Sequence, residues 1–226
     1  MKFGIPLLLS ILLLVSPCFA QDDWATVQGQ ICLDDDRRTP IEGALVWLVR
    51  NGESNPIHPC MESLRNCPLR LKIIDNKIGA KSILIMTKQK LHVTNNDNVT
   101  RGFVPITFGN EGSSSIGAGE TQIYEFRNPD KIPGRFANVM DFDNSIPILI
   151  LDHPYMAQTD ERGKFSLDLL PTGQAKLRFW HPEHGFLEGL DSKSLSTNRR
   201  GIGSITLNSD IELDLRLMPQ KIKNAR

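Results

Sequence analysis

The chain has 226 residues, with 26 Lys and Arg against 26 Asp and Glu, so its formal net charge is zero. A neutral total argues against nucleic acid as a partner, because nucleic-acid-binding surfaces are strongly basic. The length is sufficient for one or two domains, each with a packed core.

The first segment has the features of a secretory leader. Lys2 is its only charge, residues 5–15 form an apolar run, and Ala20 is a small residue before the polar Gln21. The apolar run is shorter than the roughly 20 residues that cross a bilayer as a helix. We therefore expect residues 1–20 to be a signal peptide, and the cleaved protein to be secreted or periplasmic without a membrane span.

After the leader, nearly every periodic segment favours a β-strand. Apolar and polar residues alternate, or β-branched residues cluster, in segments separated by turn-forming Gly, Pro, Asn and Asp. These segments are 26–33, 44–49, 82–86, 91–94, 122–126, 146–151, 164–167, 175–180 and 212–217. Short strands with frequent turns predict an all-β fold made of sandwiches. A helix competes only at residues 60–67, which is a very short segment.

Three cysteines remain after the expected cleavage, so at least one thiol is unpaired unless chains are cross-linked. Cys60 and Cys67 flank a short polar segment, and a disulfide between them would contribute about 2.5 kcal/mol. Two metal ligands are the alternative, but only His58 lies near them, which does not complete a zinc site. Cys32 lies in a predicted strand, where we expect a buried, inert thiol.

Four sequence elements resemble those of carboxypeptidase regulatory-like sandwiches. They are the strand segments Thr26–Ile31 and Pro40–Val46, the turn Thr159–Phe165 and the turn Leu170–Gly173. The resemblance implies a β-sandwich of the prealbumin or starch-binding type, built from residues 24–50 and 153–218. We expect Gly43 and Gly163 to occupy turns with positive φ, and the alternating residues Val46, Leu48, Phe165, Leu167, Leu177, Phe179, Leu213, Leu215 and Leu217 to face its core.

A second resemblance covers the middle of the chain. Lys90–Asp97, Phe126–Pro129 and Leu151–Tyr155 resemble the frame of secreted plastocyanin-like proteins, which are cupredoxin-type domains often labelled methylamine-utilisation proteins. This implies a cupredoxin-like sandwich over residues 70–152, inserted into the regulatory-like one. Residues 51–69 would then be a linker with the Cys pair, and residues 219–226 a tail.

Members of the plastocyanin-like family bind copper through a His and a Cys-x-x-His-x-x-Met run. The corresponding positions here are Arg101, Asn138, Asp141 and Asn144. Such a centre needs a thiolate and two imidazoles, and a guanidinium repels the metal. We therefore expect a copper-free, degenerate site, held by a contact of Arg101 with Asp141 or Asp143. A hard cation bound by Asp141, Asp143 and Asn144 is the alternative.

No nucleophile elbow, acid–base pair or phosphate loop is visible, so we expect neither enzymatic activity nor a cofactor. The sequence favours an exported binding or interaction module whose partner is an unknown protein or polysaccharide of the cell envelope. The alternative is a copper or electron-transfer protein with a non-standard ligand set. That set would be His153, His181 and His184, together with Met140 or Met156. Otherwise we expect His153 and Tyr155 to fix the domain junction by hydrogen bonds.

Overall fold

The computed structural model describes residues 23–49, 55–110, 112 and 115–218. Within these residues the fold is made of β-strands, apart from the short helix α1 (Pro59–Glu62) and the 3-10 turn η1 (Ser63–Asn66) that follows it. The predicted all-β class is confirmed. The expected signal peptide and the 219–226 tail lie outside the described residues. In the described part of the chain, no helix has the length and apolar character needed to cross a bilayer.

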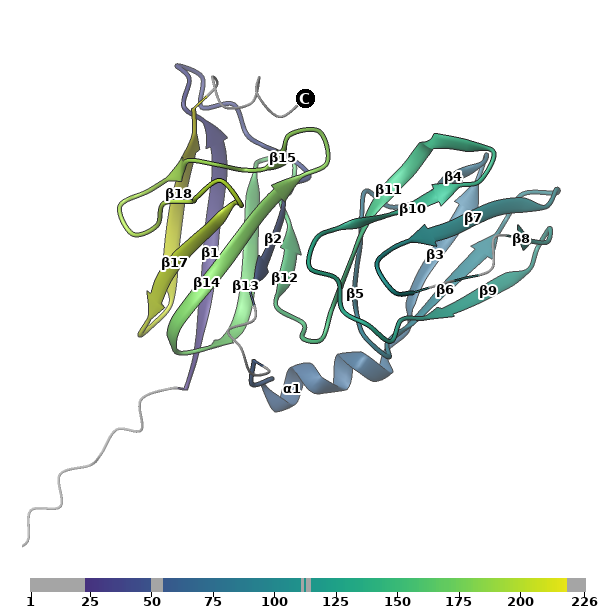
Figure 1. The fold of residues 1–226 in the computed structure, drawn as a ribbon, viewed down its shortest axis with the longest axis horizontal. Coiled ribbons are helices and arrows are strands. Elements are labelled where there is room, and N and C mark those ends of the chain that lie inside the picture. Colours follow the sequence, from purple (N-terminus) through teal and green to yellow (C-terminus); the bar gives the residue numbers. More distant parts are fainter. Residues whose placement is uncertain (1–22, 50–54, 111, 113–114, 219–226) are drawn as a thin grey trace, which may run out of the picture.

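The first sandwich contains strands from both ends of the described chain (Figure 1). One sheet has the order β13-β1-β18-β16, and the other has the order β12-β2-β14-β15 with β17 paired to β14. β1 is parallel to β18 and antiparallel to β13. The strands are β1 (Trp24–Leu33), β2 (Leu45–Leu48), β12 (Met156–Gln158), β13 (Lys164–Pro171), β14 (Gly173–His181), β15 (Gly185–Phe186), β16 (Leu190–Asp191), β17 (Ile202–Leu207) and β18 (Ile211–Leu217).

All nine residues expected to face the core of this sandwich are buried. Phe165 and Phe179 share that core with Val46 and Leu48, and the two phenyl rings meet edge to face with their centroids 6.1 Å apart. The turn glycines behave as predicted, because φ is +80° at Gly43 and +73° at Gly163.

The second sandwich contains the strands between β2 and β12. One sheet has the order β5-β11-β10-β7-β8 and the other the order β4-β3-β6-β9. A core of aliphatic and aromatic residues, including Phe103 and Phe136, lies between them. The strands are β3 (Leu69–Ile74), β4 (Lys77–Ile78), β5 (Ile83–Met86), β6 (Lys90–Asn95), β7 (Arg101–Ile106), β8 (Ser115–Ile116), β9 (Thr121–Glu125), β10 (Gly134–Asn138) and β11 (Asp141–Leu151).

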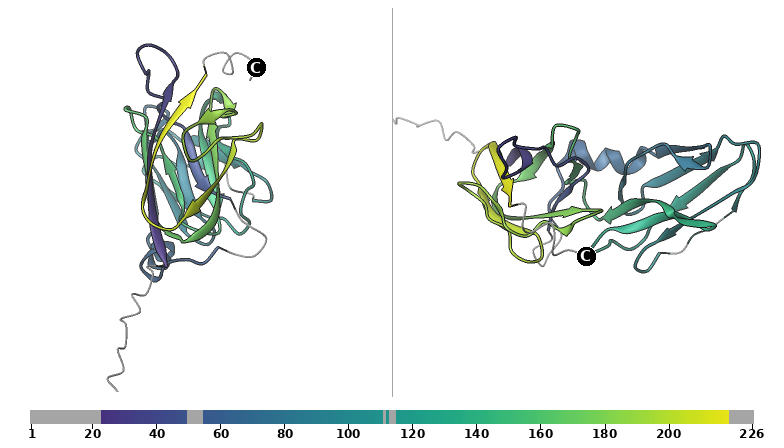
Figure 2. Two further views of the ribbon diagram at one scale, coloured as in Figure 1. Left: turned by 90° about the vertical axis from the view of Figure 1, so that its left-hand side faces the viewer. Right: turned by 90° about the horizontal axis from the view of Figure 1, so that it is seen from above.

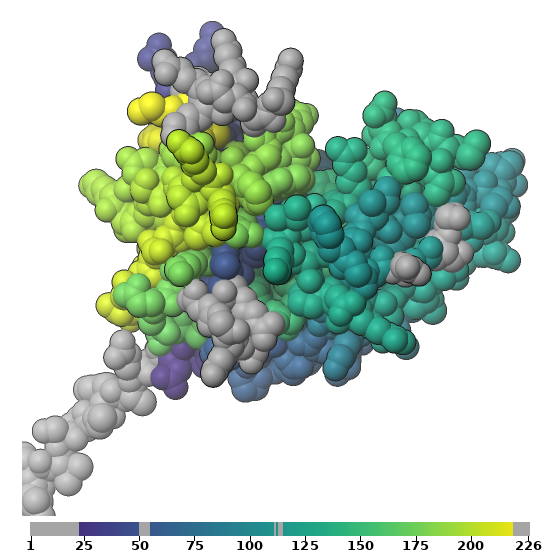
Figure 3. Space-filling view, in the orientation of Figure 1, coloured from purple at the N-terminus to yellow at the C-terminus, as the bar shows by residue number. Residues whose placement is uncertain are grey.

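The two sandwiches lie side by side and give the molecule an elongated shape (Figure 2). A third apolar cluster joins them, formed by Leu45 and Trp47 of β2 with Leu149 and Leu151 of β11. The space-filling view shows the two lobes in contact along this seam (Figure 3). Polar contacts cross it as well, because Ser82 Oγ donates to Gln158 Oε1 over 3.0 Å and Lys81 pairs with Glu42.

Tyr155 fixes the chain near this junction. Its hydroxyl donates to the carbonyl of Pro56 (3.0 Å) and accepts the backbone N–H of His58 (3.1 Å). His153 Nδ1 accepts the backbone N–H of Tyr155 at 3.2 Å. These are hydrogen bonds of the kind expected for the 152–155 corner.

The expected Cys60–Cys67 disulfide is absent, and both residues are exposed free thiols. The helical segment between them explains the difference. Pro59 opens α1, and His58 Nδ1 accepts the backbone N–H of Cys60 at 3.1 Å as a cap. A helical segment rises about 1.5–2 Å per residue, which separates the two cysteines by roughly 10 Å, beyond the reach of a disulfide. Cys32 is buried as predicted, and burial raises the pKa of its thiol.

Candidate functional site

Arg101, the first of the four positions that the sequence resemblance compares with copper ligands, makes an ion pair with Asp97. Arg101 begins β7, and its Nε donates to Asp97 Oδ2 over 2.6 Å. The expected partner, Asp141 or Asp143, was wrong. Asp97 is closer because it lies in the turn that connects β6 to β7, four residues before Arg101.

Asp97 is also the acceptor for the turn between β3 and β4. Its two carboxylate oxygens accept the backbone N–H groups of Asp75 (2.7 Å) and Asn76 (2.9 Å). The hydrogen bond from Asn76 is the largest cause that lowers the pKa of Asp97; burial opposes it, and the bond from Arg101 lowers the pKa further. Asp97 therefore carries a charge that the surrounding donors stabilise.

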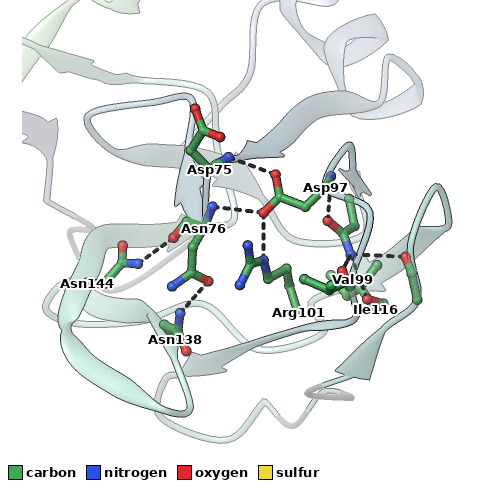
Figure 4. A network of polar contacts seen from close by, with 10 residues as sticks. Asp75, Asn76, Asp97, Val99, Arg101, Ile116, Asn138 and Asn144 are labelled. Atoms are coloured by element: carbon green, nitrogen blue, oxygen red, sulfur yellow. Dashed lines mark hydrogen bonds and ion pairs between the residues drawn. The ribbon is translucent and has the colours of Figure 1, made fainter.

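Asn138 and Asn144 meet on the same turn (Figure 4). Asn138 Nδ2 donates to Asn76 Oδ1 over 2.9 Å, and its Oδ1 accepts the backbone N–H of Met140 at 2.9 Å. Asn144 Nδ2 donates to the carbonyl oxygen of Asn76. Three of the four positions thus belong to one polar network, which we call the Asn76 network: Asp75, Asn76, Asp97, Arg101, Asn138 and Asn144.

The central members of this network, Asp75 and Asn76, were not singled out by the sequence reasoning. They form a two-residue connection between the paired residues Ile74 and Lys77, and their φ values are +51° and +60°. Two positive φ values are typical of a tight hairpin turn, where Asp and Asn are favoured. An Asp-Asn pair between two short apolar segments is the signal that would have predicted the turn, although not its partners.

Asp141, the fourth position, makes no side-chain hydrogen bond with the described members of the network, although it lines a cleft beside Asn76 and Asn144. It is exposed at the start of β11 and lines an open cleft of about 480 Å³ together with Asp75, Lys77 and Asp143. The donors at the four positions are two amides, a guanidinium and a carboxylate. A cupredoxin centre needs a thiolate and imidazoles, so the residues present do not fit copper.

The histidines of the alternative ligand set do not lie together. Trp180, beside His181, pairs with Leu45 at one end of β2, whereas Tyr155 binds Leu48 at the other end. Leu45 and Leu48 are three residues apart along the strand, which is a distance of about 10 Å. His181 and His153 lie beyond these two ends of β2, on opposite sides, and are therefore farther apart. A single centre containing both is therefore excluded by the strand pairing.

His181, Glu183 and His184 form a tighter group, with their ligand atoms within 4.8 Å of one another. The rings of His181 and His184 stack with centroids 4.4 Å apart. However, His181 Nδ1 accepts the backbone N–H of Glu183 at 3.1 Å, so Nε2 carries the proton and donates to the carbonyl of Glu42 at 2.9 Å. Burial lowers the pKa of His181. The neutral ring thus has both nitrogens in hydrogen bonds.

A hollow of about 310 Å³ lies where the end of β14 faces β10 and β11. The half-buried Trp180 and the exposed Pro182 line one side, and Arg135, Asp143 and Ser145 line the other. An aromatic ring beside charged and hydroxyl groups can hold a polar molecule by stacking and hydrogen bonds.

No family model matches the chain, and no curated protein matches it. Solved structures similar to part of it are cupredoxins. A purple cupredoxin from Nitrosopumilus maritimus is 10% identical, with a TM-score of 0.32 over 36% of this chain and 98% of its own. Amicyanin from Paracoccus versutus is 6% identical, with a TM-score of 0.32 over 46% and 96%. A Cu-containing nitrite reductase (NirK) from Thermus scotoductus SA-01 is 15% identical, with a TM-score of 0.32 over 46% and 25%.

Proposed function

We propose that the chain is an exported, non-enzymatic binding module with a copper-free cupredoxin-like sandwich. In this proposal residues 70–152 are an insertion between residues 24–50 and 153–218, which form a regulatory-like sandwich. The pairing of β1 with β18 and of β2 with β14 supports the division. The secretory pattern of the leader supports export.

The hydrogen bonds of the Asn76 network are the observation that supports a copper-free site. Arg101 and Asn138 occupy two of the four ligand positions, and both are engaged in hydrogen bonds within the protein. Neither a thiolate nor an imidazole stands at any of the four. A guanidinium that is paired with a carboxylate has no free lone pair with which to bind a soft metal.

Calorimetry of the mature protein with Cu(II) and with Cu(I) tests this part of the proposal. We expect no tight one-to-one binding, and none in Arg101→His, because the thiolate and the second imidazole are still missing. His184→Ala identifies binding at the separate group of His181, Glu183 and His184. Tight binding that Asn138→Ala or Asp141→Ala abolishes, and that His184→Ala leaves unchanged, would contradict the proposal.

The alternative function, copper binding by a non-standard set, is reduced to the His181, Glu183 and His184 group. Its close ligand atoms favour it, and the hydrogen bonds of His181 oppose it. The same titration separates the two functions, because His181→Ala would then abolish binding. A copper-loaded sample without strong visible absorption would exclude a blue thiolate centre in either case.

An envelope polysaccharide is the partner that the Trp180 hollow suits. The indole offers a stacking surface, and Arg135 and Asp143 offer hydrogen bonds to hydroxyl groups. Retention of the mature protein on insoluble cell-wall polysaccharide tests this, with Trp180→Ala compared against Trp24→Ala, which changes a tryptophan away from the hollow. Equal retention of the two variants, or none for the wild type, would leave a protein as the partner.

A further inference from the structure

A cavity of about 320 Å³ lies at the seam between the two sandwiches. Its walls are mainly apolar: Trp47 and Leu48 come from the first sandwich, and Pro129 and Leu151 from the second. Asp130 and Arg178 line it as well, together with Lys131, Asp152 and His153. Small-molecule sites are typically apolar cavities of this kind at a domain interface, with a few polar groups that fix the orientation of the ligand.

Asp130 brings a buried carboxyl to this cavity. The residue is only 5% exposed, and its Oδ1 accepts the backbone N–H of Phe108 at 3.2 Å. Its Oδ2 is buried without any hydrogen-bond donor. Burial raises the pKa of Asp130 to about 6, so the carboxyl is mainly ionised at neutral pH, and it makes no ion pair with another described residue.

Arg178 brings a cation with an incomplete set of partners. Its Nη1 donates to the carbonyl of Lys131 over 2.7 Å, and its guanidinium lies 5.7 Å from the centre of the Trp47 ring. Its Nε is buried without an acceptor, and no carboxylate of the described residues makes an ion pair with it. Burial lowers the pKa of its guanidinium, as expected for a cation that lacks a nearby anion.

These two residues account for two of the four buried side-chain atoms that have no partner in the described structure, and both line the same cavity. Buried polar atoms are almost always paired, so a concentration of unpaired ones needs an explanation. A bound molecule that carries a donor for Asp130 and an acceptor for Arg178 would supply it. Both atoms are covered, so the bound molecule reaches them only after small side-chain rotations. The terminal torsion of aspartate permits such a rotation, because its energy well is broad.

We propose that the seam cavity binds a small zwitterion with an apolar body, its ammonium group at Asp130 and its carboxylate at Arg178. The cavity has the volume of about ten water molecules at about 30 Å³ each. A cavity of this volume is large enough to admit a single apolar amino acid. The apolar walls receive the hydrocarbon part, and charge-assisted hydrogen bonds at the two ends orient the molecule.

Calorimetry on the whole mature protein tests the proposal with L-leucine and 6-aminohexanoate, which differ in the separation of their charges. Hexanoate and hexylamine are the analogues that lack one charge each. We expect one of the zwitterions to bind roughly 10–100-fold more tightly than either analogue, which is the usual effect of a hydrogen bond to a charged group. No binding by either zwitterion at millimolar concentration would overturn the proposal.

Two variants and two controls assign the ends of the ligand. In Asp130→Asn the zwitterion should bind no better than hexanoate, while hexanoate binding stays unchanged; a general loss of structure would weaken both. In Arg178→Gln the zwitterion should bind no better than hexylamine. Asp191→Asn and Arg199→Gln change exposed residues and should leave all affinities unchanged. Unaltered zwitterion binding in Asp130→Asn or in Arg178→Gln would show that the ligand does not lie as proposed.

Discussion

A single carboxylate holds the Asn76 network together. Asp97 accepts two backbone N–H groups and the Nε of Arg101, so its loss leaves three donors without an acceptor. Loss of the Asp97 side chain should therefore destabilise the protein, whereas loss of the exposed Asp141 or Asp143 side chain should not.

We predict that Asp97→Ala lowers the free energy of unfolding more than the loss of a neighbouring exposed carboxylate does, because three donors lose their shared acceptor. Urea denaturation measures this. Asp143→Ala changes an exposed carboxylate and should stay within about 0.5 kcal/mol of the wild type. Equal stability of the two variants would mean that the network does not contribute to folding.

Because the pKa of Asp97 is lowered, the stabilisation that Asp97 provides is present above the ordinary carboxyl pKa of about 3.9 and is lost as pH falls through the lower pKa of the folded protein.

Asp130 acts in the opposite direction. Its pKa rises from 3.8 to about 6 on folding, so between these values the folded protein holds a proton that the unfolded chain has released. Stability therefore falls as pH rises through this window and stays constant above it.

We predict that Asp130→Asn removes this fall, which is at most about 3 kcal/mol. Urea denaturation at several pH values from 4 to 7.5 measures it. Asp191→Asn should keep the slope of the wild type. A variant Asp130→Asn with the same slope as the wild type would show that another group titrates in this window.

At the residue scale, the motif frame in the sequence points to Arg101, Asn138 and Asn144, and all three make hydrogen bonds within the Asn76 network. Their correspondence to copper ligands stays a prediction. Asp75 and Asn76 were missed, because contacts between turns of different strands leave no periodic pattern. Asp97 lies in a turn that the sequence predicts, but the sequence does not indicate that its carboxylate is the shared acceptor.

Strand elements were predicted well where one face is buried. The two-residue period placed every expected core residue of β2, β13, β14 and β18 correctly. The turn before β13 also behaves as its residues suggest, since Asp160 Oδ1 accepts the backbone N–H groups of Arg162 and Lys164. At Gly163 an added Cβ would lie 2.3 Å from the carbonyl oxygen of Ile31, so only glycine fits there.

The expected disulfide was the failure at this scale, because the segment 60–67, the one place where a helix competes in the sequence, is helical as far as Asn66. A run of eight residues is too short for an apolar stripe, and no residue of α1 or η1 is buried. Its signals are a proline in the first turn and the capping His58. Tertiary contacts add to these, because Arg65 Nη1 donates to the carbonyl of Thr87 over 2.6 Å.

We predict that Phe165→Ala lowers the free energy of unfolding by about 3–5 kcal/mol, because the ring is buried against Phe179 and its removal leaves a cavity. Chemical denaturation measures the effect. Phe142 is 57% exposed, and Phe142→Ala should change stability by less than about 0.5 kcal/mol. Similar costs for both substitutions would contradict the assignment of Phe165 to the core.

At the scale of the whole molecule, two strands are buried on both faces. In β11, Ile148 and Ile150 face the core of the second sandwich, whereas Leu149 and Leu151 join the seam. In β2, Val46 and Leu48 face the first core, whereas Leu45 and Trp47 join the seam. Continuous apolar runs are typical of strands that are covered on both sides. The sequence shows these apolar runs, but it does not show which second surface covers them.

The seam should therefore be sensitive to a single substitution on its face of β11. We predict that Leu149→Ala raises the accessibility of Trp47 and Trp180 to acrylamide quenching and lowers the free energy of unfolding by about 2–5 kcal/mol. Leu149 is fully buried between the sandwiches, beside Trp47. Leu215→Ala is the matched control, because Leu215 is equally buried but lies in the core of the first sandwich.

Both substitutions remove the same atoms and should destabilise the protein, so stability alone does not locate the effect. Quenching under native conditions does, since it depends on how closely the two sandwiches pack around the indole rings. If Leu215→Ala increased quenching as much as Leu149→Ala, the tryptophans would report general loosening rather than the seam. If neither did, the apolar cluster that contains Leu149 and Trp47 would not be what holds the two sandwiches together.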